Sequence, residues 1–402
     1  MNRDRFPAVM AAAAHGQILA DNAAGTQLPD VALERMQRYL AYDNAQKGAG
    51  FRRTRATSEL IEEVKTEFAA LIGVPGGSVG IGANATSIAL SFSRLVASGI
   101  RAGDRVVVTA ADHEANVAPW MWLRRFGAQI DVVPVSGTGD LDEAKLRMLL
   151  AREPKLVALP WASNATGTIF DVARYARLAK ASGAVVCVDG VQALPHLPLE
   201  IDAAFDFVTF SAYKIYAPHV GFWYMNRATA DRFVRADDAH VPGGDARNWT
   251  LETGTQPHEA LAGFLGTLAY LRDIAPMPRL AIDTIARYES TLAVHACGRF
   301  AERAAEITLY GRPASERRLP VFAFNVAQTP CDDLAERLDR ANIEARVGDY
   351  YCPRTMGAVA KAAGGRAVRL SLAHYNTTEE IDRCFDVIDS AIENRSLGAM
   401  RA

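Results

Sequence analysis

The feature that most constrains the fold is a regular alternation of expected strands and helices between about residues 80 and 225. The expected strands are short apolar runs at 106–110, 127–135, 156–160, 184–189 and 205–210, and a closing strand is expected at 221–225. Helical patterns separate several of these strands, which predicts a parallel sheet with helices on both faces. No GxGxxG or Walker loop accompanies the pattern, which counts against dinucleotide binding and NTP hydrolysis.

Four helices are expected around this sheet, at 55–72, from about residue 85, at 140–151 and at 172–183. The first is amphipathic and is closed by Gly73. The third begins with an Asp-x-x-Glu pattern at Asp140, which is typical of a capping box.

A second, smaller set of elements follows an expected hinge at residues 275–278. The pattern there predicts helices at 282–304, 331–342 and 378–395 and strands at 321–327, 343–348 and 367–372. We therefore expect an α/β protein with a mostly parallel sheet and a smaller α+β domain at the C-terminal end.

Composition and charge exclude several classes of function. Half of the 402 residues are hydrophobic, which is typical of a soluble globular protein with a large core. The net charge of −2 gives no electrostatic case for nucleic acid or an anionic membrane. No apolar run reaches the roughly 18 residues of a membrane span, and we do not expect residues 8–20 to be a signal peptide.

The five cysteines form no CxxC pair and the eight histidines form no HExxH pattern. This argues against a disulfide framework and against a metal site. It is typical of a protein in a reducing cytoplasm, which is the location we expect.

Two polar side chains stand where expected buried strands end. Asp189 ends the strand at 184–189, and Lys214 follows the strand at 205–210 by a short turn. The C-terminal ends of parallel strands meet at one crevice, where ligands bind. Taken alone, Lys214 is more simply a loop lysine that reaches water. Together, the amine suits a Schiff base with pyridoxal phosphate (PLP), and the carboxylate would keep the pyridine nitrogen protonated.

The two strand ends also carry a family resemblance. The segments VDGVQA (188–193) and TFSAYK (209–214) resemble the signature of class V aminotransferase-fold PLP enzymes, and within them the cysteine desulfurase-like group. The resemblance implies the type I aminotransferase fold. It divides the chain into an N-terminal segment, 1–22, that packs with the small domain, a large PLP-binding domain, 23–275, and a small domain, 276–402.

The resemblance implies specific contacts with the cofactor ring. Lys214 would carry PLP, Asp189 would bind the pyridine nitrogen, and His113 would stack on the ring. Gln192 would bond the phenolic oxygen, and Asn164 would lie between that oxygen and the substrate carboxylate.

The resemblance also implies a set of phosphate contacts, and this sequence departs from the family pattern at three of the positions involved. Ala85 replaces a threonine before Thr86, at the start of the helix expected from residue 85, where free N–H groups suit a phosphate. Ser211 matches, while Tyr213 replaces a histidine. Thr255, in a segment with an inserted Gln256, would reach the phosphate of a neighbouring subunit, which implies a homodimer with active sites at the interface.

Arg369 lies in AVRLSLAHYNTTEEID, which closely matches the R-x-S-x-x-x-Y-N-T-x-E-E segment of the family. There the arginine makes a bidentate bond to the α-carboxylate of the substrate, which its planar guanidinium suits. The alternative is a strand-end arginine in a surface ion pair.

The sequence leaves the role of Cys352 open. Desulfurases attack the substrate sulfur with a mobile cysteine thiolate in a G-H-H-C type loop. Aligned on Gly348, Tyr351 falls on that cysteine position and Cys352 comes one residue later. Cys352 is therefore either the catalytic thiol, displaced by one residue in a flexible loop, or a packed structural thiol.

These observations predict a PLP-dependent enzyme that acts on a small amino acid. The leading interpretation is desulfurase-like C–S bond cleavage with Lys214, His113 and Cys352 as catalytic residues and with a possible sulfur-acceptor protein. The alternatives are a C–S β-lyase, an epimerase or an aminotransferase without a catalytic cysteine. A non-catalytic scaffold is a further alternative, but such a protein would need neither Lys214 nor Asp189.

Overall fold

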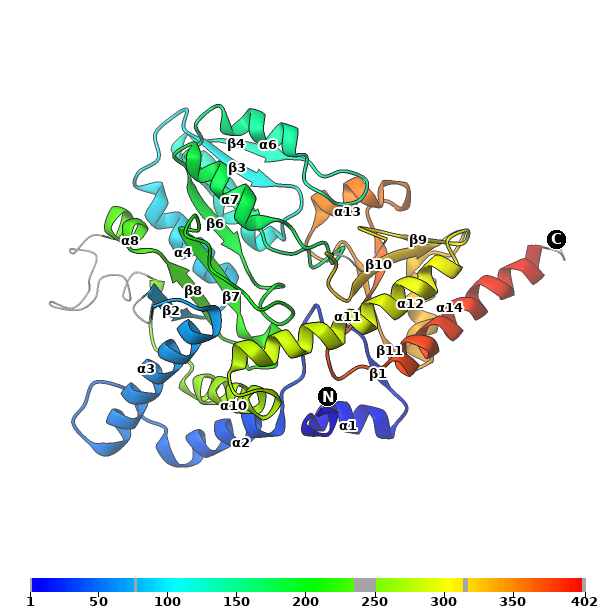
Figure 1. The fold of residues 1–402 in the computed structure, drawn as a ribbon, viewed down its shortest axis with the longest axis horizontal. Helices are drawn as coiled ribbons and strands as arrows, with labels where there is room; N and C mark the ends of the chain where they lie inside the picture. The colour runs from blue at the N-terminus through cyan, green and yellow to red at the C-terminus, as the bar shows by residue number, and fades with distance from the viewer. Residues whose placement is uncertain (1, 76–77, 235–250, 314–316, 400–402) are drawn as a thin grey trace.

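The computed structural model describes residues 2–75, 78–234, 251–313 and 317–399. Within these residues, seven strands form the central sheet in the order β2-β8-β7-β6-β5-β3-β4 (Figure 1). The sheet is parallel except for β8, which pairs antiparallel with both β2 and β7. The strands are β2 (Val79–Gly82), β3 (Arg105–Thr109), β4 (Gln129–Val133), β5 (Leu156–Pro160), β6 (Val185–Asp189), β7 (Phe207–Ser211) and β8 (Gly221–Met225). The predicted α/β fold with a mostly parallel sheet is confirmed.

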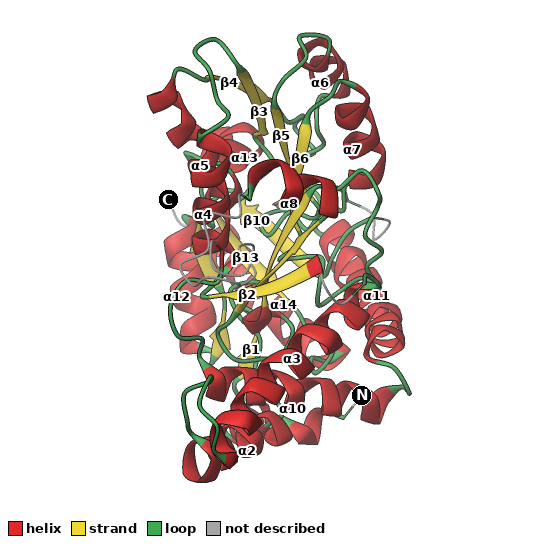
Figure 2. Ribbon diagram, turned by 90° about the vertical axis from the view of Figure 1, so that its left-hand side faces the viewer, coloured by secondary structure: helices red, strands yellow, loops and turns green. Residues whose placement is uncertain are grey.

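The sheet is buried on both faces because alternate residues of each inner strand enter different cores. In β5, Val157 and Leu159 pack in one hydrophobic cluster, whereas Leu156 and Ala158 pack in the other. A strand that is buried on both faces needs a continuous apolar run, which explains why these segments show no polar alternation. Figure 2 shows the strands between two layers of helices.

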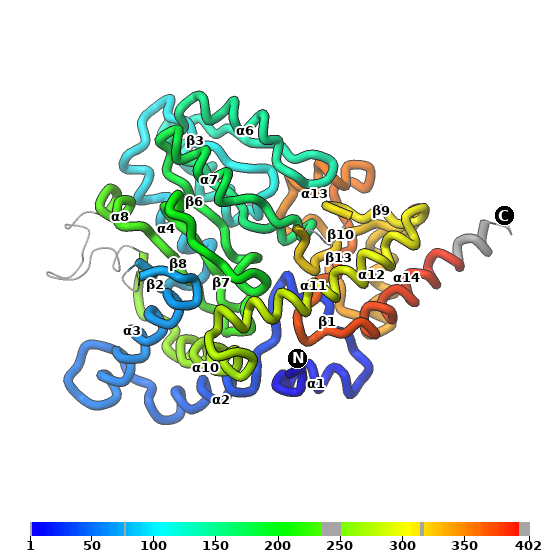
Figure 3. Tube along the Cα trace, in the orientation of Figure 1, coloured from blue at the N-terminus to red at the C-terminus, as the bar shows by residue number. Residues whose placement is uncertain are grey.

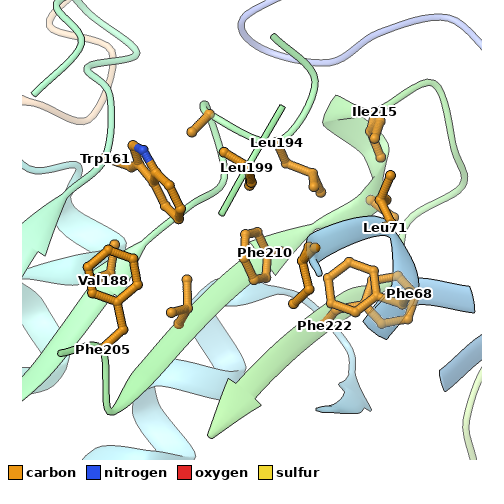
Figure 4. Packing of buried hydrophobic residues seen from close by; sticks show 14 of the residues in the cluster. Phe68, Leu71, Trp161, Val188, Leu194, Leu199, Phe205, Phe210, Ile215 and Phe222 are labelled. Atoms are coloured by element: carbon orange, nitrogen blue, oxygen red, sulfur yellow. The ribbon is translucent and has the colours of Figure 1, made fainter. Parts of the chain in front are cut away.

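One core lies under the helices α3 (Arg52–Ile72), α6 (Glu143–Leu150), α7 (Val172–Ala181), α10 (His258–Ile274) and the start of α11 (Pro278–Glu302). Phe68 of α3 stacks on Phe222 of β8 with ring centroids 4.2 Å apart, and Phe210 meets Phe68 edge-on (Figure 4). The other core lies under α4 (Ala85–Ala97), α5 (Ala118–Met121) and α8 (Arg227–Phe233). Burial of such large aromatic side chains supplies much of the driving force for folding.

The start of α6 differs from the prediction. The helix begins at Glu143, where the Asp142 side chain accepts a hydrogen bond from the backbone N–H of Lys145. The predicted cap, Asp140, instead pairs with Arg312 at 2.6 Å. The cap is therefore two residues later than predicted, because either aspartate satisfies the sequence preference for a capping residue.

The second sheet is antiparallel, with the order β12-β13-β10-β9. Its strands are β9 (Ile307–Leu309), β10 (Val321–Val326), β12 (Arg346–Gly348) and β13 (Ala367–Ser371), and α11, α12 (Cys331–Arg340) and α14 (Thr378–Ala399) pack around its core. The single strand predicted at 343–348 is wrong, because β11 (Ile343–Glu344) and β12 belong to different sheets. The short β9 and the helix α13 (Pro353–Val359) were not predicted.

The N-terminal segment contributes α1 (Pro7–Ala14) and β1 (Ile18–Leu19), which pairs in parallel with β11. Figure 3 shows this part of the tube beside the C-terminal elements. The chain then forms a loop at 20–29 and enters α2 (Asp30–Arg38). No helix in the described ranges has both the length and the apolar character to cross a bilayer.

Candidate active site

Lys214 ends a short 3-10 turn, Ala212–Lys214, directly after β7. Its side chain is buried, and its Nζ donates to the backbone carbonyl oxygens of Ala23 and Ala24. Burial, together with the positive charge of Arg369, lowers the pKa of Lys214 to about 7. A substantial fraction of this amine is therefore neutral near pH 7, as nucleophilic attack on a carbonyl requires.

Asp189 ends β6, the parallel neighbour of β7, so the two strands deliver Asp189 and Lys214 to the same edge of the sheet. The carboxylate accepts a hydrogen bond from the backbone N–H of Val191 at 2.9 Å. Burial raises the pKa of Asp189 to about 6, while the Val191 N–H and Lys214 oppose the rise. A cationic ring nitrogen is the partner that such a carboxylate would favour.

The predicted cofactor residues converge on one cavity. Its lining includes Ala85, Thr86, His113, Asn164, Asp189, Gln192, Ser211, Tyr213 and Lys214. A second cavity of about 500 Å³ shares Lys214 and His113 with the first and is also lined by Arg369. The sequence thus predicted most of the lining, because the carboxyl ends of parallel strands meet at this edge.

Two predicted residues do not reach these cavities. Thr255 is exposed on its own chain and lines neither cavity. Cys352 is fully buried and lines neither cavity. The proposed contact of Thr255 with a neighbouring subunit stays a prediction, since it concerns a second copy of the chain.

One end of the first cavity lies at the N-terminus of a helix. The helix α4 begins there at Ala85, whose backbone N–H donates to Ser211 Oγ at 3.1 Å. The positive end of the helix dipole favours an anion there, while the N–H groups of Ala85, Ser87 and Ile88 already donate to acceptors within the chain. Gly221 of β8 permits this close packing, because a Cβ at that position would lie 2.7 Å from the backbone of Asn84.

His113 follows β3 and is half-buried. Its Nδ1 accepts a hydrogen bond from the Ala115 N–H at 3.0 Å. Burial and the nearby positive charges of Lys214 and Arg369 lower the pKa of His113 to about 4. The ring is therefore neutral at pH 7, which suits stacking on a cationic aromatic ring better than an imidazolium would.

Gln192 and Asn164 are held by other parts of the chain. The Nε2 of Gln192 donates to the carbonyl of Ala23 at 2.9 Å, the same carbonyl that Lys214 contacts. Asn164 donates through Nδ2 to the carbonyl of Tyr350 at 2.9 Å. Both amides therefore fix the walls of the site as well as facing it.

Arg369 lies in β13 and is buried, with only 1% of its surface exposed. Its Nη1 donates to the carbonyl of Asn164, and its Nη2 donates to Asp21 Oδ1 at 2.8 Å. Its Nε has no partner among the described residues. A buried donor without a partner is costly unless a ligand supplies the acceptor, so Arg369 suits a carboxylate ligand.

The structure favours the packed alternative for Cys352. The thiol donates to Asn164 Oδ1 at 2.8 Å and is completely buried. Burial raises the pKa of this thiol well above its usual range. A thiol in this position is protonated and is a poor nucleophile, in contrast to the mobile thiolate that a desulfurase loop requires. Tyr351, one residue earlier, is exposed and lines the larger cavity.

Two residues of the site, Asp112 and Asp21, were not among the predicted site residues. Asp112 lies beside Asp189 in the first cavity, and burial raises its pKa to about 8. Asp21 pairs with both Arg369 and Arg346. Asp112 could have been predicted from the sequence, because it follows the same strand end as His113. Asp21 could not, because it reaches the site only through long-range packing.

These residues fit PLP. They provide a buried amine with a lowered pKa, an acid on the adjacent strand, a neutral histidine and a helix N-terminus for the phosphate, all around one cavity. No group of three or more His, Cys, Asp or Glu side chains suited to a metal ion occurs within the described ranges.

Comparisons with known proteins agree with this fit. The sequence profile of the aminotransferase class-V family matches residues 18–384. The chain is 32% identical to a cysteine desulfurase of Pectobacterium atrosepticum, over 95% of both chains. It is 27% identical to the aminotransferase-like protein FGM3 of Gibberella zeae, over 97% of both chains.

The fold also matches a solved structure. The apo structure of a cysteine desulfurase from Thermococcus onnurineus superposes with a TM-score of 0.86 and 24% identity, covering 98% of this chain and 97% of that one. The match establishes the fold over nearly the whole chain. The protein belongs to the aminotransferase class-V family and is a PLP-dependent, cysteine desulfurase-like enzyme.

Proposed function

We propose that the enzyme cleaves the C–S bond of a small L-α-amino acid. The observation that carries the proposal is the convergence of Lys214, Asp189 and Arg369 on two adjoining cavities. This set provides an amine for the cofactor, an acid for its ring nitrogen and a cation for the substrate carboxylate. Relatives with the name cysteine desulfurase, at 30–32% identity over 95% of the chain, support sulfur chemistry in particular.

PLP, when bound, supplies an electron sink for negative charge at the substrate Cα. Lys214 would hold the cofactor and then remove the Cα proton, since its lowered pKa lets the neutral amine act as a base at neutral pH. Asp189 would keep the ring nitrogen protonated. Arg369 would orient the substrate through its α-carboxylate, for which its Nε is free among the described residues.

The phosphate would bind at the N-terminus of α4, with Ser211 and Thr86 beside it. Tyr213, whose ring stacks on His219 at 5.0 Å, would add a hydroxyl donor in place of the family histidine. Thr255 would complete the site from a second copy, so we propose a homodimer. The division at 1–22, 23–275 and 276–402 and a cytoplasmic location are also part of this proposal.

Two routes for the sulfur follow from the position of Cys352. In the desulfurase route, this thiol would leave its buried site, take the sulfur as a persulfide and pass it to an acceptor protein. In the second route, the sulfur leaves by β-elimination and no protein thiol takes part. The hydrogen bond from Cys352 to Asn164 and the burial of the thiol favour the second route.

Product analysis with L-cysteine and PLP-loaded enzyme tests the proposal. Alanine with persulfide or sulfide, lost in Cys352→Ala, would establish the desulfurase route. Pyruvate, ammonia and sulfide, formed equally by Cys352→Ala, would establish elimination. Cys384→Ala removes another buried thiol far along the chain, in α14, and serves as the matched control. Release of no sulfur from L-cysteine or an S-substituted cysteine would contradict the proposal.

A further inference from the structure

We infer that Tyr351 is a specificity-determining residue, which selects cysteine derivatives with an apolar substituent on sulfur over free cysteine. The inference rests on the proposed C–S bond cleavage and names its substrate class. Tyr351 lines the larger cavity, and its ring lies 5.6 Å from the ring of His113. Its side chain is 69% exposed although the neighbouring residues, Tyr350 and Cys352, are buried.

The backbone around Tyr351 is held in an unusual conformation. Tyr350 and Tyr351 both have φ of +58°, in the left-handed region that bulky residues seldom adopt. Two successive residues of this kind are costly unless the surroundings enforce them, and such strain concentrates at functional sites. The contacts of the turn supply this enforcement.

Four contacts fix the turn. The Tyr350 carbonyl accepts from Asn164 Nδ2 at 2.9 Å, and the Tyr351 carbonyl accepts from the Glu114 N–H at 2.8 Å. The Tyr351 N–H donates to Asp349 Oδ1 at 3.0 Å. The Cys352 thiol donates to Asn164, so this cysteine acts as an anchor of the turn.

The anchored turn gives its two tyrosines different tasks. Tyr350 points inward, where its hydroxyl donates to the Ala367 carbonyl and its ring lies 4.6 Å from the guanidinium of Arg369. Tyr350 and Tyr351 both line the larger cavity, but only Tyr351 is exposed there. A substrate held by Arg369 through its carboxylate would therefore share this cavity with Tyr351.

The larger cavity suits an apolar group beside Tyr351. It measures about 500 Å³, and alanines 23, 24, 115 and 118 contribute to its wall. Of the residues that would contact the cofactor, Asp189, Gln192 and Ser211 line only the adjoining cavity, whereas Thr86, His113, Asn164, Tyr213 and Lys214 line both. The part of the larger cavity beside Tyr351 and these alanines would take the sulfur substituent, because aromatic rings favour contact with apolar or aromatic groups.

No cysteine is among the described residues that line the two cavities, so no protein thiol is placed to accept the sulfur. The sulfur would therefore leave still bonded to its substituent R. A substrate R–S–CH₂–CH(NH₃⁺)–COO⁻ and one water would give R–SH, pyruvate and NH₄⁺. The Cβ–S bond breaks with both electrons passing to sulfur, and the thiolate takes a proton to become R–SH. No oxidant or reductant is needed, because the elimination and hydrolysis are together redox-neutral.

A substrate comparison tests the inference. We would measure kcat/KM for S-benzyl-L-cysteine and for L-cysteine with the wild-type holoenzyme, Tyr351→Ala and Tyr351→Phe. The wild type should prefer S-benzyl-L-cysteine, and Tyr351→Ala should reduce that preference roughly tenfold, the scale of one lost aromatic or methylene contact. Tyr351→Phe keeps the ring and should keep the preference. An equal preference in the wild type and in Tyr351→Ala would overturn the inference.

A binding measurement separates this inference from the proposed function. The dissociation constants of both amino acids are obtained from the change in cofactor absorbance, which needs no turnover. If no thiol is released but Tyr351→Ala weakens S-benzyl-L-cysteine binding selectively, the C–S cleavage proposal fails and the role of Tyr351 stands. If binding does not distinguish the two ligands in the wild type, the role of Tyr351 fails.

Discussion

Arg369 and Arg346 are cross-strand partners in the antiparallel pair β13–β12, and Asp21 bridges them. The carboxylate lies 2.8 Å from Arg369 and 2.7 Å from Arg346. Two like charges on adjacent strands repel, so an anion between them stabilises the pair. In this structure the anion is part of the chain, in the place where a substrate carboxylate is expected to approach Arg369.

Asp21→Asn should therefore bind amino-acid carboxylates more tightly. Removal of the Asp21 charge leaves Arg369 and Arg346 without their counter-charge. We therefore expect the dissociation constant of L-alanine to fall about fivefold, as for the gain of one partly solvated charge-assisted hydrogen bond. The free energy of unfolding should also fall, because a buried arginine loses its partner. Both are measured on the holoenzyme, by cofactor absorbance and by denaturant titration.

The matched control for this variant is Asp231→Asn, which removes an exposed ion pair with Arg227 on α8. It should leave both quantities unchanged. Weaker L-alanine binding in Asp21→Asn would show that Asp21 orients Arg369 for the substrate instead of competing with it.

The rate of PLP incorporation should depend on pH through Lys214. The folded-state pKa of about 7 lies below the ordinary value of 10.5, so deprotonation of this amine occurs earlier than in the unfolded chain. The rate of cofactor uptake by apoprotein should rise through about pH 7 and level off above it, because only the neutral amine attacks the cofactor aldehyde. Stopped-flow absorbance measures this rate. A midpoint near 10.5 would contradict the assigned environment of Lys214.

Asp112→Asn should stabilise the protein in a pH-dependent way. The pKa of Asp112 rises from 3.8 to about 8 in the folded state, so the folded protein binds one more proton than the unfolded chain between those values. The contribution of Asp112 to the free energy of unfolding of the wild type therefore decreases as the pH rises from about 4 to about 8. An asparagine does not titrate and can keep the contacts with Thr109 and Asn116.

The advantage of Asp112→Asn should thus be small at pH 4 and grow to several kcal/mol near pH 8, because the free energy of keeping this buried carboxyl ionised rises across that range. Urea titrations at several pH values measure it. A gain that is constant across the range would mean that the carboxyl does not change its protonation state as described.

The sequence predicted six of the seven described strands of the central sheet, because these are short apolar runs with clear boundaries, whereas the glycine-containing strand β2 was not predicted. It also predicted that Lys214 and Asp189 share an edge, since that follows from parallel neighbours. The division of 343–348 into β11 and β12 was not predictable, because one residue between two short strands leaves no pattern. The cap of α6 was ambiguous because both Asp140 and Asp142 precede it.

The predictions for the Cys352 region were limited in a different way. Local sequence cannot show that Asn164, 188 residues away, binds the thiol and the Tyr350 carbonyl. Nor does it indicate that two tyrosines adopt positive φ, a conformation usually associated with glycine. Such features depend on long-range packing. By contrast, Arg369 was predictable because its whole surrounding segment carries the family pattern.

The central claim is that Lys214 carries the cofactor. Lys214→Ala should therefore reduce turnover at least about a thousandfold while the protein stays folded. Lys155→Ala, on an exposed lysine, is the control. The most direct measurement is borohydride reduction of PLP-loaded enzyme, followed by peptide mass mapping. The account predicts the reduced cofactor on the peptide that contains Lys214, and its absence in Lys214→Ala. Attachment to another lysine, or full activity of Lys214→Ala, would contradict it.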